Sequence, residues 1–203
     1  MLINDEIVMK YFDKVDYKGA KIDIYKKCPV YTEDILTLKL TASEDASELL
    51  KCYSDEKSVP LFNSDNCNGD DFHYTTIDRM KKAIDFWQFS YKNRYFIRFT
   101  VVLNKTGEKI GTVEMFKREA NDEFNHFGVL RIDLQSKYEE QKYIDEILEI
   151  ANKNFYKDFD VEFILTKAIQ AASERIISLG KKGYKPIDEK FVIYDDYFIN
   201  GNK

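Results

Sequence analysis

The sequence predicts a mixed α/β fold, in which helices flank a central sheet that contains one parallel crossover. An antiparallel hairpin is predicted at residues 95–116, and the order strand–helix–strand–helix–strand follows it from residue 127 onward. Aromatic residues make up 15% of the chain and are mostly Tyr and Phe, which suits a core built on a sheet.

The first part of the chain predicts strands, a helix and a loop. The segment KIDIY, residues 21–25, is a candidate short strand, and residues 35–40 alternate apolar and polar side chains as a strand does. Residues 41–44, Thr-Ala-Ser-Glu, have the form of a capping box that opens a helix through Tyr53. The polar, Asn/Asp/Gly-rich residues 54–74 predict a surface loop.

The middle of the chain predicts a helix and a β-hairpin. Residues 75–78, Thr-Thr-Ile-Asp, form a second capping box, and apolar positions then recur with helical spacing as far as Trp87. Residues 95–103 are rich in β-branched and aromatic side chains, as expected of a strand. Residues 104–107, Asn-Lys-Thr-Gly, predict the turn, and residues 109–116 predict the returning strand.

The last part predicts three strands and two helices. Strands are expected at residues 127–134, 161–168 and 191–199, and a helix at residues 172–182 is expected to end at Gly183. The helix between the first two strands carries one apolar stripe, formed by Ile144, Ile147, Leu148, Ala151 and Phe155.

Length and composition predict one globular domain. The chain has 203 residues, of which 44% are hydrophobic and 33% charged, so we expect an N-terminal extension at residues 1–30 and a single domain at residues 31–203. The net charge of −5, mixed along the chain, argues against nucleic acid or an anionic membrane as a partner.

Cysteines and the N-terminus predict a cytoplasmic protein. Cys28, Cys52 and Cys67 are widely spaced and form neither a CxxC motif nor a Cys/His cluster, so we expect free thiols and no metal site. The N-terminal residues lack the pattern of a signal peptide, and no apolar run is long enough to span a membrane.

Residues 128–151 predict a buried strand, a short loop and an amphipathic helix. This arrangement is typical of phosphate sites, in which the N–H groups at a helix N-terminus hold an anion. The loop, however, contains Glu139 and Glu140 where a phosphate site favours glycine.

Four segments in this order resemble the GNAT superfamily of acyl-CoA-dependent N-acetyltransferases. They are ILTLKLTASEDASELLKCYSD, GEKIGTVEMF, RIDLQSKYEEQKYIDEIL and GKKGYKPI, which begin at residues 35, 107, 131 and 180. Within the superfamily the chain looks most like the branch that acetylates the N-termini of ribosomal proteins. The resemblance implies the GNAT-like fold, in which a mixed sheet contains two parallel strands that splay apart.

The resemblance also implies a site for acetyl-CoA between those strands, here residues 127–134 and 161–168. In the family, backbone groups of the first strand pair with the pantetheine arm, and backbone N–H groups of the following loop and helix hold the pyrophosphate. The corresponding residues of this chain are Ile132, Asp133 and Leu134 on the strand, and Gln141, Lys142, Tyr143 and Ile144 on the helix.

The chain departs from the family pattern at the pyrophosphate loop. Lys137 takes the basic first position, but Glu140 and Lys142 stand where the family has glycine. The two carboxylates of Glu139 and Glu140 are expected to supply the negative charge that a helix N-terminus favours. On the next helix, Ala172 and Leu179 stand where the family often has asparagine and tyrosine.

Glu114 is the candidate catalytic base, because it lies on the hairpin strand beside the cofactor strand and faces away from Val113 and Met115. The simpler interpretation of Glu114 is a solvated glutamate, and that of Asp133 is a surface or capping residue. His126 is expected to be an exposed structural residue, Cys67 to lack an activating neighbour, and Trp87 to lie in the core.

These features favour an N-acetyltransferase that transfers an acetyl group from acetyl-CoA to an amine, either a protein N-terminus or a small molecule. The alternative is a GNAT-fold protein that has lost CoA binding and acts as a ligand-binding or regulatory module. A monomer and a homodimer are both compatible with the sequence.

Overall fold

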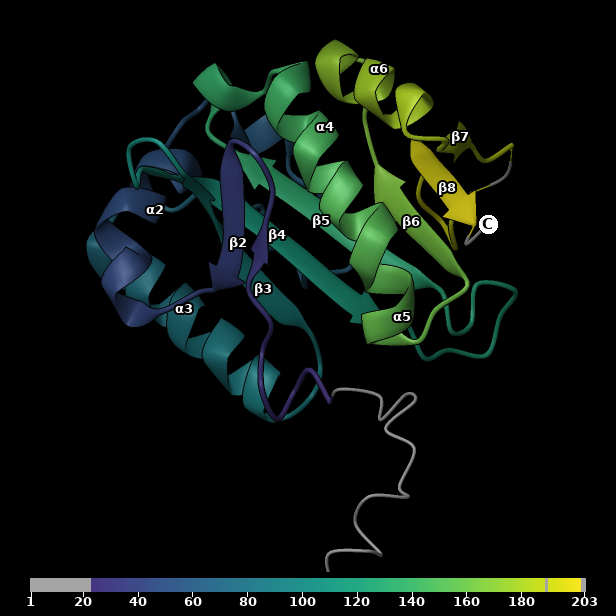
Figure 1. The fold of residues 1–203 in the computed structure, drawn as a ribbon, viewed down its shortest axis with the longest axis horizontal. Helices are drawn as coiled ribbons and strands as arrows, with labels where there is room; N and C mark the ends of the chain where they lie inside the picture. Colours follow the sequence, from purple (N-terminus) through teal and green to yellow (C-terminus); the bar gives the residue numbers. More distant parts are fainter. Residues whose placement is uncertain (1–22, 189, 202–203) are drawn as a thin grey trace, which may run out of the picture.

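Eight strands pair into one sheet in the computed structural model, which describes residues 23–188 and 190–201 (Figure 1). The strands are β1 Tyr31–Thr32, β2 Leu36–Leu40, β3 Ile97–Leu103, β4 Lys109–Lys117, β5 Gly128–Leu134, β6 Phe163–Lys167, β7 Lys185–Pro186 and β8 Tyr197–Gly201. The helices are α2 Ala46–Tyr53, α3 Ile77–Lys92, α4 Gln141–Ile150, α5 Tyr156–Phe159 and α6 Ser173–Lys181. Over the described ranges, no helix has the length and apolar character needed to cross a membrane.

The strand order is β1-β2-β3-β4-β5-β6-β8-β7, and β5 and β6 are the one parallel pair among the described strands. Helix α4 connects these two strands and packs on the front face of the sheet in Figure 1, beside α6, whereas α2 and α3 lie at the left, away from α4. The predicted mixed α/β fold with one parallel crossover is therefore confirmed.

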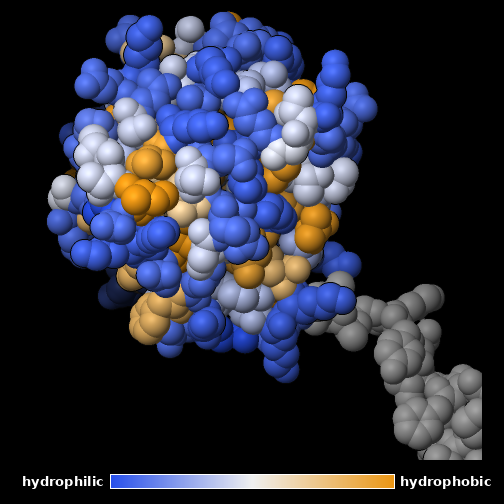
Figure 2. All heavy atoms as spheres, turned by 90° about the vertical axis from the view of Figure 1, so that its left-hand side faces the viewer, coloured by the Kyte–Doolittle hydropathy of each residue, from blue (hydrophilic) through white to orange (hydrophobic). Residues whose placement is uncertain are grey.

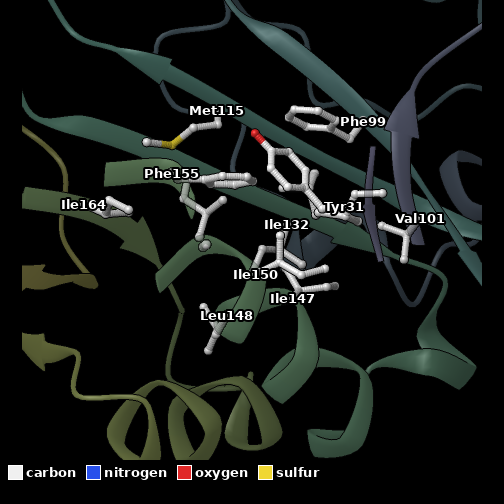
Figure 3. Close-up of a cluster of buried hydrophobic side chains, with 14 of the residues drawn as sticks. Tyr31, Phe99, Val101, Met115, Ile132, Ile147, Leu148, Ile150, Phe155 and Ile164 are labelled. Atoms are coloured by element: carbon white, nitrogen blue, oxygen red, sulfur yellow. The ribbon is translucent and has the colours of Figure 1, made fainter. Parts of the chain in front are cut away.

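The face of the sheet beneath α4 is apolar. Alternate residues of β3, β4 and β5 point into a cluster with the apolar stripe of α4, and Figure 3 shows Phe99, Met115 and Ile132 in this cluster with Ile147 and Leu148. These side chains are fully or almost fully buried. Their burial supplies the main driving force for folding at this face.

The opposite face of β3, β4 and β5 is polar, yet it is also buried. The residues between the apolar ones on these strands are Arg98, Thr100, Thr112, Glu114, Arg131 and Asp133. A second apolar cluster, built from α2, α3 and their connection, covers this polar face.

The connection between α2 and α3 differs from the predicted surface loop. Ser58, Phe62, Asn63, Phe72 and Tyr74 are buried, although residues 54–74 are rich in Asn, Asp and Gly. The apolar side chains of this segment pack against α2 and α3, and its polar groups bond to the sheet. The loop is confirmed for this segment apart from one 3₁₀ turn, Val59–Leu61, but its position at the surface was only partly correct, because a few apolar anchors outweigh the polar composition.

Of the two predicted capping boxes, one is confirmed and the other is shifted by one residue. Thr76 caps α3 and accepts a hydrogen bond from the Arg79 backbone N–H at 3.3 Å, which confirms the second capping box. Thr41 does not cap the first helical segment: the Asp45 carboxylate accepts a hydrogen bond from the Ala42 N–H at 3.1 Å instead. The residues after Thr41 first form a short 3₁₀ turn, Ser43–Asp45, and this turn shifts the cap by one residue.

Two predicted strands near the chain ends differ from the structure, one in its start and one in its existence. The strand expected at residues 191–199 begins only at Tyr197, because Val192 and Asp196 adopt left-handed backbone conformations with φ of 61° and 67°. The short strand expected at residues 21–25 is a turn over its described part, and Lys21 and Ile22 lie outside the described residues. Ile24 is buried in the main core, so the described part of the N-terminal extension packs on the domain.

Candidate functional site

The parallel strands β5 and β6 separate along their length. Their pairing covers Gly128, Val129 and Leu130 of β5 and ends where Leu130 lies opposite Thr166. Strand β5 continues to Leu134 in register with β4, so among the described strands its edge toward β6 is unpaired over the last four residues. The predicted gap between splayed parallel strands is therefore present.

The hydrogen bonds between β4 and β5 determine which backbone groups of β5 face this gap. Gln135 donates its backbone N–H to the Ile110 carbonyl at 2.9 Å, so alternation assigns the backbone groups of Asp133 to β4 as well. The N–H and C=O groups of Ile132 and Leu134 point the other way, into the gap. Of the three strand residues predicted to pair with pantetheine, Ile132 and Leu134 have suitable geometry, whereas the backbone of Asp133 is turned toward β4.

The N-terminus of α4 lies at the end of the same strand. Glu140 is the N-cap residue, and its carbonyl accepts hydrogen bonds from the N–H groups of Tyr143 and Ile144 at 3.1 and 3.2 Å. Gln141 and Lys142 have N–H groups without a hydrogen-bond partner in the described part of the chain. The predicted set of four anion-binding N–H groups is thereby reduced to these two, because the first turn of the helix uses the other two.

The two glutamates of the loop pair with basic side chains and form no hydrogen bond to the N–H groups of α4. The Glu140 carboxylate forms an exposed ion pair with the Lys142 Nζ at 2.8 Å. The buried Glu139 carboxylate accepts hydrogen bonds from Nε and Nη2 of Arg175 at 2.8 and 2.9 Å. Neither carboxylate caps α4, so the helix still presents unbonded N–H groups to an anion.

Asp55, in the connection between α2 and α3, contacts the start of the loop that leads from β5 to α4. Its carboxylate accepts the Ser136 backbone N–H at 2.9 Å and the Ser58 hydroxyl at 2.9 Å. Burial raises the pKa of Asp55, but the hydrogen bonds from Ser136 and Ser58 outweigh burial and lower it to about 2. The carboxylate is therefore ionised at neutral pH and fixes the start of the loop.

Strand register brings alternating charges together on the polar face. Glu114 of β4 lies directly opposite Arg98 of β3 on one side and Arg131 of β5 on the other. Its Oε2 accepts hydrogen bonds from Nε and Nη2 of Arg98 at 3.1 and 2.6 Å, and its Oε1 accepts one from Nη1 of Arg131 at 2.9 Å. Glu114 is only 2% exposed, so the interpretation as a solvated glutamate was wrong.

Asp133 completes this network. Its Oδ2 accepts hydrogen bonds from Nη1 of Arg98 at 2.6 Å and from the Tyr53 hydroxyl at 2.9 Å, and the residue is fully buried. A surface or capping role for Asp133 was therefore also a wrong interpretation. The Tyr53 hydroxyl also lies 2.6 Å from the Thr112 hydroxyl, which ties α2 to the same network.

The two buried carboxylates differ in pKa. Burial raises the pKa of Glu114, but Arg98 and Arg131 outweigh burial, and the resulting pKa lies below the ordinary value. For Asp133 burial is the larger effect, and its pKa lies above the ordinary value despite the contact with Arg98. Glu114 is thus the carboxylate that stays ionised most firmly.

A cavity of about 470 Å³ opens onto this network from the side of α3. Glu114, Arg98 and Arg131 lie at its base, and aromatic side chains form its walls: Phe72, Tyr74, Phe86, Trp87, Phe96 and Phe116. Figure 2 looks onto the side of the molecule where α2 and α3 lie and shows small hydrophobic groups among hydrophilic side chains. The cavity has the size of a small-molecule or side-chain site.

The remaining candidate residues have structural positions. Trp87 is in the core, as predicted, and His126 is exposed, as predicted. Cys67 lines the cavity, but burial raises the pKa of its thiol, so a thiolate is disfavoured. Ala172 is the N-cap of α6, and Leu179 is buried in the core, so neither offers a polar group to the gap.

Comparisons with known proteins agree with this geometry. The family model for the acetyltransferase (GNAT) domain matches residues 36–179. A GNAT-family acetyltransferase from Bacillus anthracis is similar in structure, with a TM-score of 0.63 and 12% identity over 86% of this chain and 99% of that one. A comparison with curated proteins found no match.

Two further solved structures resemble this chain at low identity. The ribosomal-protein-S5-alanine acetyltransferase from Vibrio fischeri has a TM-score of 0.61 and 15% identity over 86% of this chain and 97% of that one. RimJ from Mycobacterium smegmatis, solved in complex with CoA-disulfide, has a TM-score of 0.66 and 10% identity over 82% of this chain and 81% of that one. At these identities the likeness concerns the fold.

Proposed function

The chain belongs to the GNAT family of acetyltransferases, whose domain model matches residues 36–179, and we propose that it transfers an acetyl group from acetyl-CoA to an amine. One observation carries the proposal: within the part of the chain that the structure describes, the end of β5 has an unpaired edge and lies beside a helix N-terminus with two unbonded N–H groups. A peptide-like arm and a phosphate group are the ligands that these two features bind best.

Acetyl-CoA supplies the acetyl group as a thioester. Ile132 and Leu134 would pair with the amides of its pantetheine arm, because their N–H and C=O groups face the gap between β5 and β6. The N–H groups of Gln141 and Lys142 would hold a phosphate group. A backbone N–H in the gap would also polarise the thioester carbonyl.

The acceptor amine would enter through the cavity that Glu114 lines. Glu114 would accept its proton, directly or through a water molecule. As the bond between nitrogen and the acyl carbon forms, the C–S bond of the thioester breaks, and CoA would leave as a thiolate that takes up a proton from water. The nitrogen becomes much more acidic as its bond to the acyl carbon forms, so a carboxylate of low pKa can take the proton at that stage. A neighbouring cavity of about 410 Å³ shares Asn66, Phe116 and Arg131 with the first, so a protein N-terminus would have room to extend across both.

Calorimetric titration of the chain with acetyl-CoA tests the proposal. Gln141→Pro removes one of the two N–H groups, and proline is well tolerated at the first position of a helix after an extended residue such as Glu140, which has φ −122° and ψ 146°. A hydrogen bond to a charged group contributes about 1.5–3 kcal/mol, so we expect an affinity for acetyl-CoA roughly ten- to a hundredfold weaker.

Gln141→Ala is the matched control, because it removes the side-chain contacts with Glu174 and Lys181 but keeps the backbone N–H. We expect its affinity to remain near that of the wild-type chain. Absence of heat with millimolar acetyl-CoA for the wild-type chain would contradict the proposed function and favour the alternative of a GNAT-fold binding module.

Replacing Glu140 with glutamine should tighten the binding of acetyl-CoA by a few fold. The substitution removes one exposed negative charge beside the phosphate site and releases Lys142 from its ion pair. Charges at a helix terminus contribute about 0.3–1 kcal/mol. The gain should disappear at high ionic strength; an equal gain at both salt concentrations would contradict this electrostatic origin.

A further inference from the structure

Arg175, in the first turn of α6, is a buried cation at the end of the gap between β5 and β6. The residue is 1% exposed. Its Nε and Nη2 donate hydrogen bonds to the Glu139 carboxylate, and its Nη1 donates one to the Leu61 carbonyl at 2.9 Å. The guanidinium therefore joins three segments that are far apart in the sequence.

The Arg175–Glu139 pair spans the end of the gap. Glu139 immediately precedes the N-cap of α4, the helix that follows β5, and Arg175 belongs to the helix that follows β6. The pair thus connects the segments that follow the two separated strands. Glu139 lies two residues before Gln141, and the Gln141 side chain donates a hydrogen bond at 3.0 Å to Glu174, the neighbour of Arg175. The pair is therefore close to the N–H groups of Gln141 and Lys142, which have no hydrogen-bond partner within the described segments.

A guanidinium in this position requires an anion. Leaving a buried charge unpaired is unfavourable, and in the structure the Glu139 carboxylate meets this need. The two parallel N–H groups of a guanidinium fit the oxygens of a phosphate as well as those of a carboxylate. A phosphate group at the N-terminus of α4 would therefore find a second, cationic partner.

We propose that Arg175 is a diphosphate-binding residue and that Glu139 occupies it until the nucleotide part of acetyl-CoA binds. This assignment rests on the proposed function. The diphosphate displaces the Glu139 carboxylate from the guanidinium, while the hydrogen bond from Nη1 to Leu61 keeps the guanidinium in position. By this exchange the diphosphate gains Arg175 as a cationic partner beside a loop in which Glu140 and Lys142 stand at the family's glycine positions.

Glu139→Gln tests the exchange with two ligands. Acetyl-CoA contains the diphosphate, and acetyl-pantetheine contains the same thioester arm without it. Glutamine keeps the size of the side chain but removes the competing charge, so we expect calorimetry to show about tenfold tighter binding of acetyl-CoA. The affinity for acetyl-pantetheine should not change.

Glu149→Gln is the matched control. Glu149 also lies on α4 and also pairs with a basic residue after α6, the Lys182 Nζ at 2.7 Å, but it is two turns away from the loop. Its substitution should leave the affinity for both ligands unchanged.

A double variant, Glu139→Leu with Arg175→Met, removes both charges and avoids an unpaired one, so it should fold with thermal stability near that of the wild-type chain. We expect it to bind acetyl-CoA at least tenfold more weakly than the wild-type chain and acetyl-pantetheine equally well.

If the wild-type chain binds acetyl-CoA but Glu139→Gln gives no gain, or the same gain for both ligands, the assignment of Arg175 is overturned and the proposed function is not. If the wild-type chain and every variant fail to bind acetyl-CoA, the proposed function is overturned and this assignment with it.

Discussion

Replacing Arg98 with methionine is expected to lower the free energy of unfolding by about 3–5 kcal/mol, because the substitution removes one partner of a buried ion-pair network. Arg98 is 2% exposed and donates hydrogen bonds to both Glu114 and Asp133. Without it, Glu114 keeps Arg131, but the Asp133 carboxylate keeps, among the described residues, only the Tyr53 hydroxyl. Urea denaturation at pH 7 measures the loss.

The loss should depend on pH in a defined direction. Burial already holds the pKa of Asp133 above its ordinary value, and loss of Arg98 removes the cation that opposes this rise. A carboxylate of raised pKa destabilises the fold increasingly as the pH rises above its value in the unfolded chain. The deficit of Arg98→Met relative to the wild-type chain should therefore be smaller at pH 5 than at pH 7.

Arg94→Met provides the control for this stability measurement. Arg94 forms two hydrogen bonds with the Asp23 carboxylate at 3.0 Å, but its side chain is 56% exposed. Removal of an exposed pair should cost less than about 1 kcal/mol. A loss of similar size for Arg94→Met and Arg98→Met would show that burial does not set the strength of the network.

The polar network could be predicted from the sequence only in part. Alternation along the two hairpin strands places Arg98 and Glu114 on the face opposite their apolar neighbours. The turn at residues 104–107 alone would place Arg98 opposite Val113, but a β-bulge between Val101 and Val102 shifts the register by one residue and brings Arg98 opposite Glu114. Opposite charges at paired positions of neighbouring strands indicate a cross-strand contact. Burial of the contact could not be inferred, because residues 54–74, which help to cover it, have the composition of a solvated loop.

The contact between Arg175 and Glu139 had no signal in the sequence. The two residues are 36 positions apart and lie on segments whose relative placement depends on the tertiary fold. The strand–loop–helix pattern of residues 128–151 predicted the helix N-terminus correctly. It could not show that Glu139 turns toward α6 and Glu140 toward solvent, because the direction of a side chain in a loop is set by its partners.

Glu114→Gln is expected to lower kcat for acetyl transfer by about 10²–10⁴-fold, the usual contribution of a positioned proton acceptor. The affinity for acetyl-CoA, measured by calorimetry, should change little, because Glu114 lies on the polar face of the sheet and not in the gap between β5 and β6. Loss of kcat at unchanged affinity for acetyl-CoA separates a role in the reaction from a general loss of structure.

The pH profile gives a second, independent test of Glu114. Its lowered pKa keeps the carboxylate ionised above the ordinary value of 4.5, so its own titration lies below the range of pH 6–9. The rise in rate with pH should follow the pKa of the acceptor amine, since the free ammonium must lose its proton before it can attack. Glu114→Gln should therefore lower the plateau of the profile without moving its rising limb.

Glu48→Gln is the matched control for this measurement. Glu48 also pairs with a basic residue of β4, the Lys109 Nζ at 2.8 Å, but it does not line the cavity. Its kcat should equal that of the wild-type chain. A decrease of less than about fivefold for Glu114→Gln would exclude Glu114 as the proton acceptor. The acceptor amine would then lose its proton to water. Glu114 would serve only to balance the positive charges of Arg98 and Arg131.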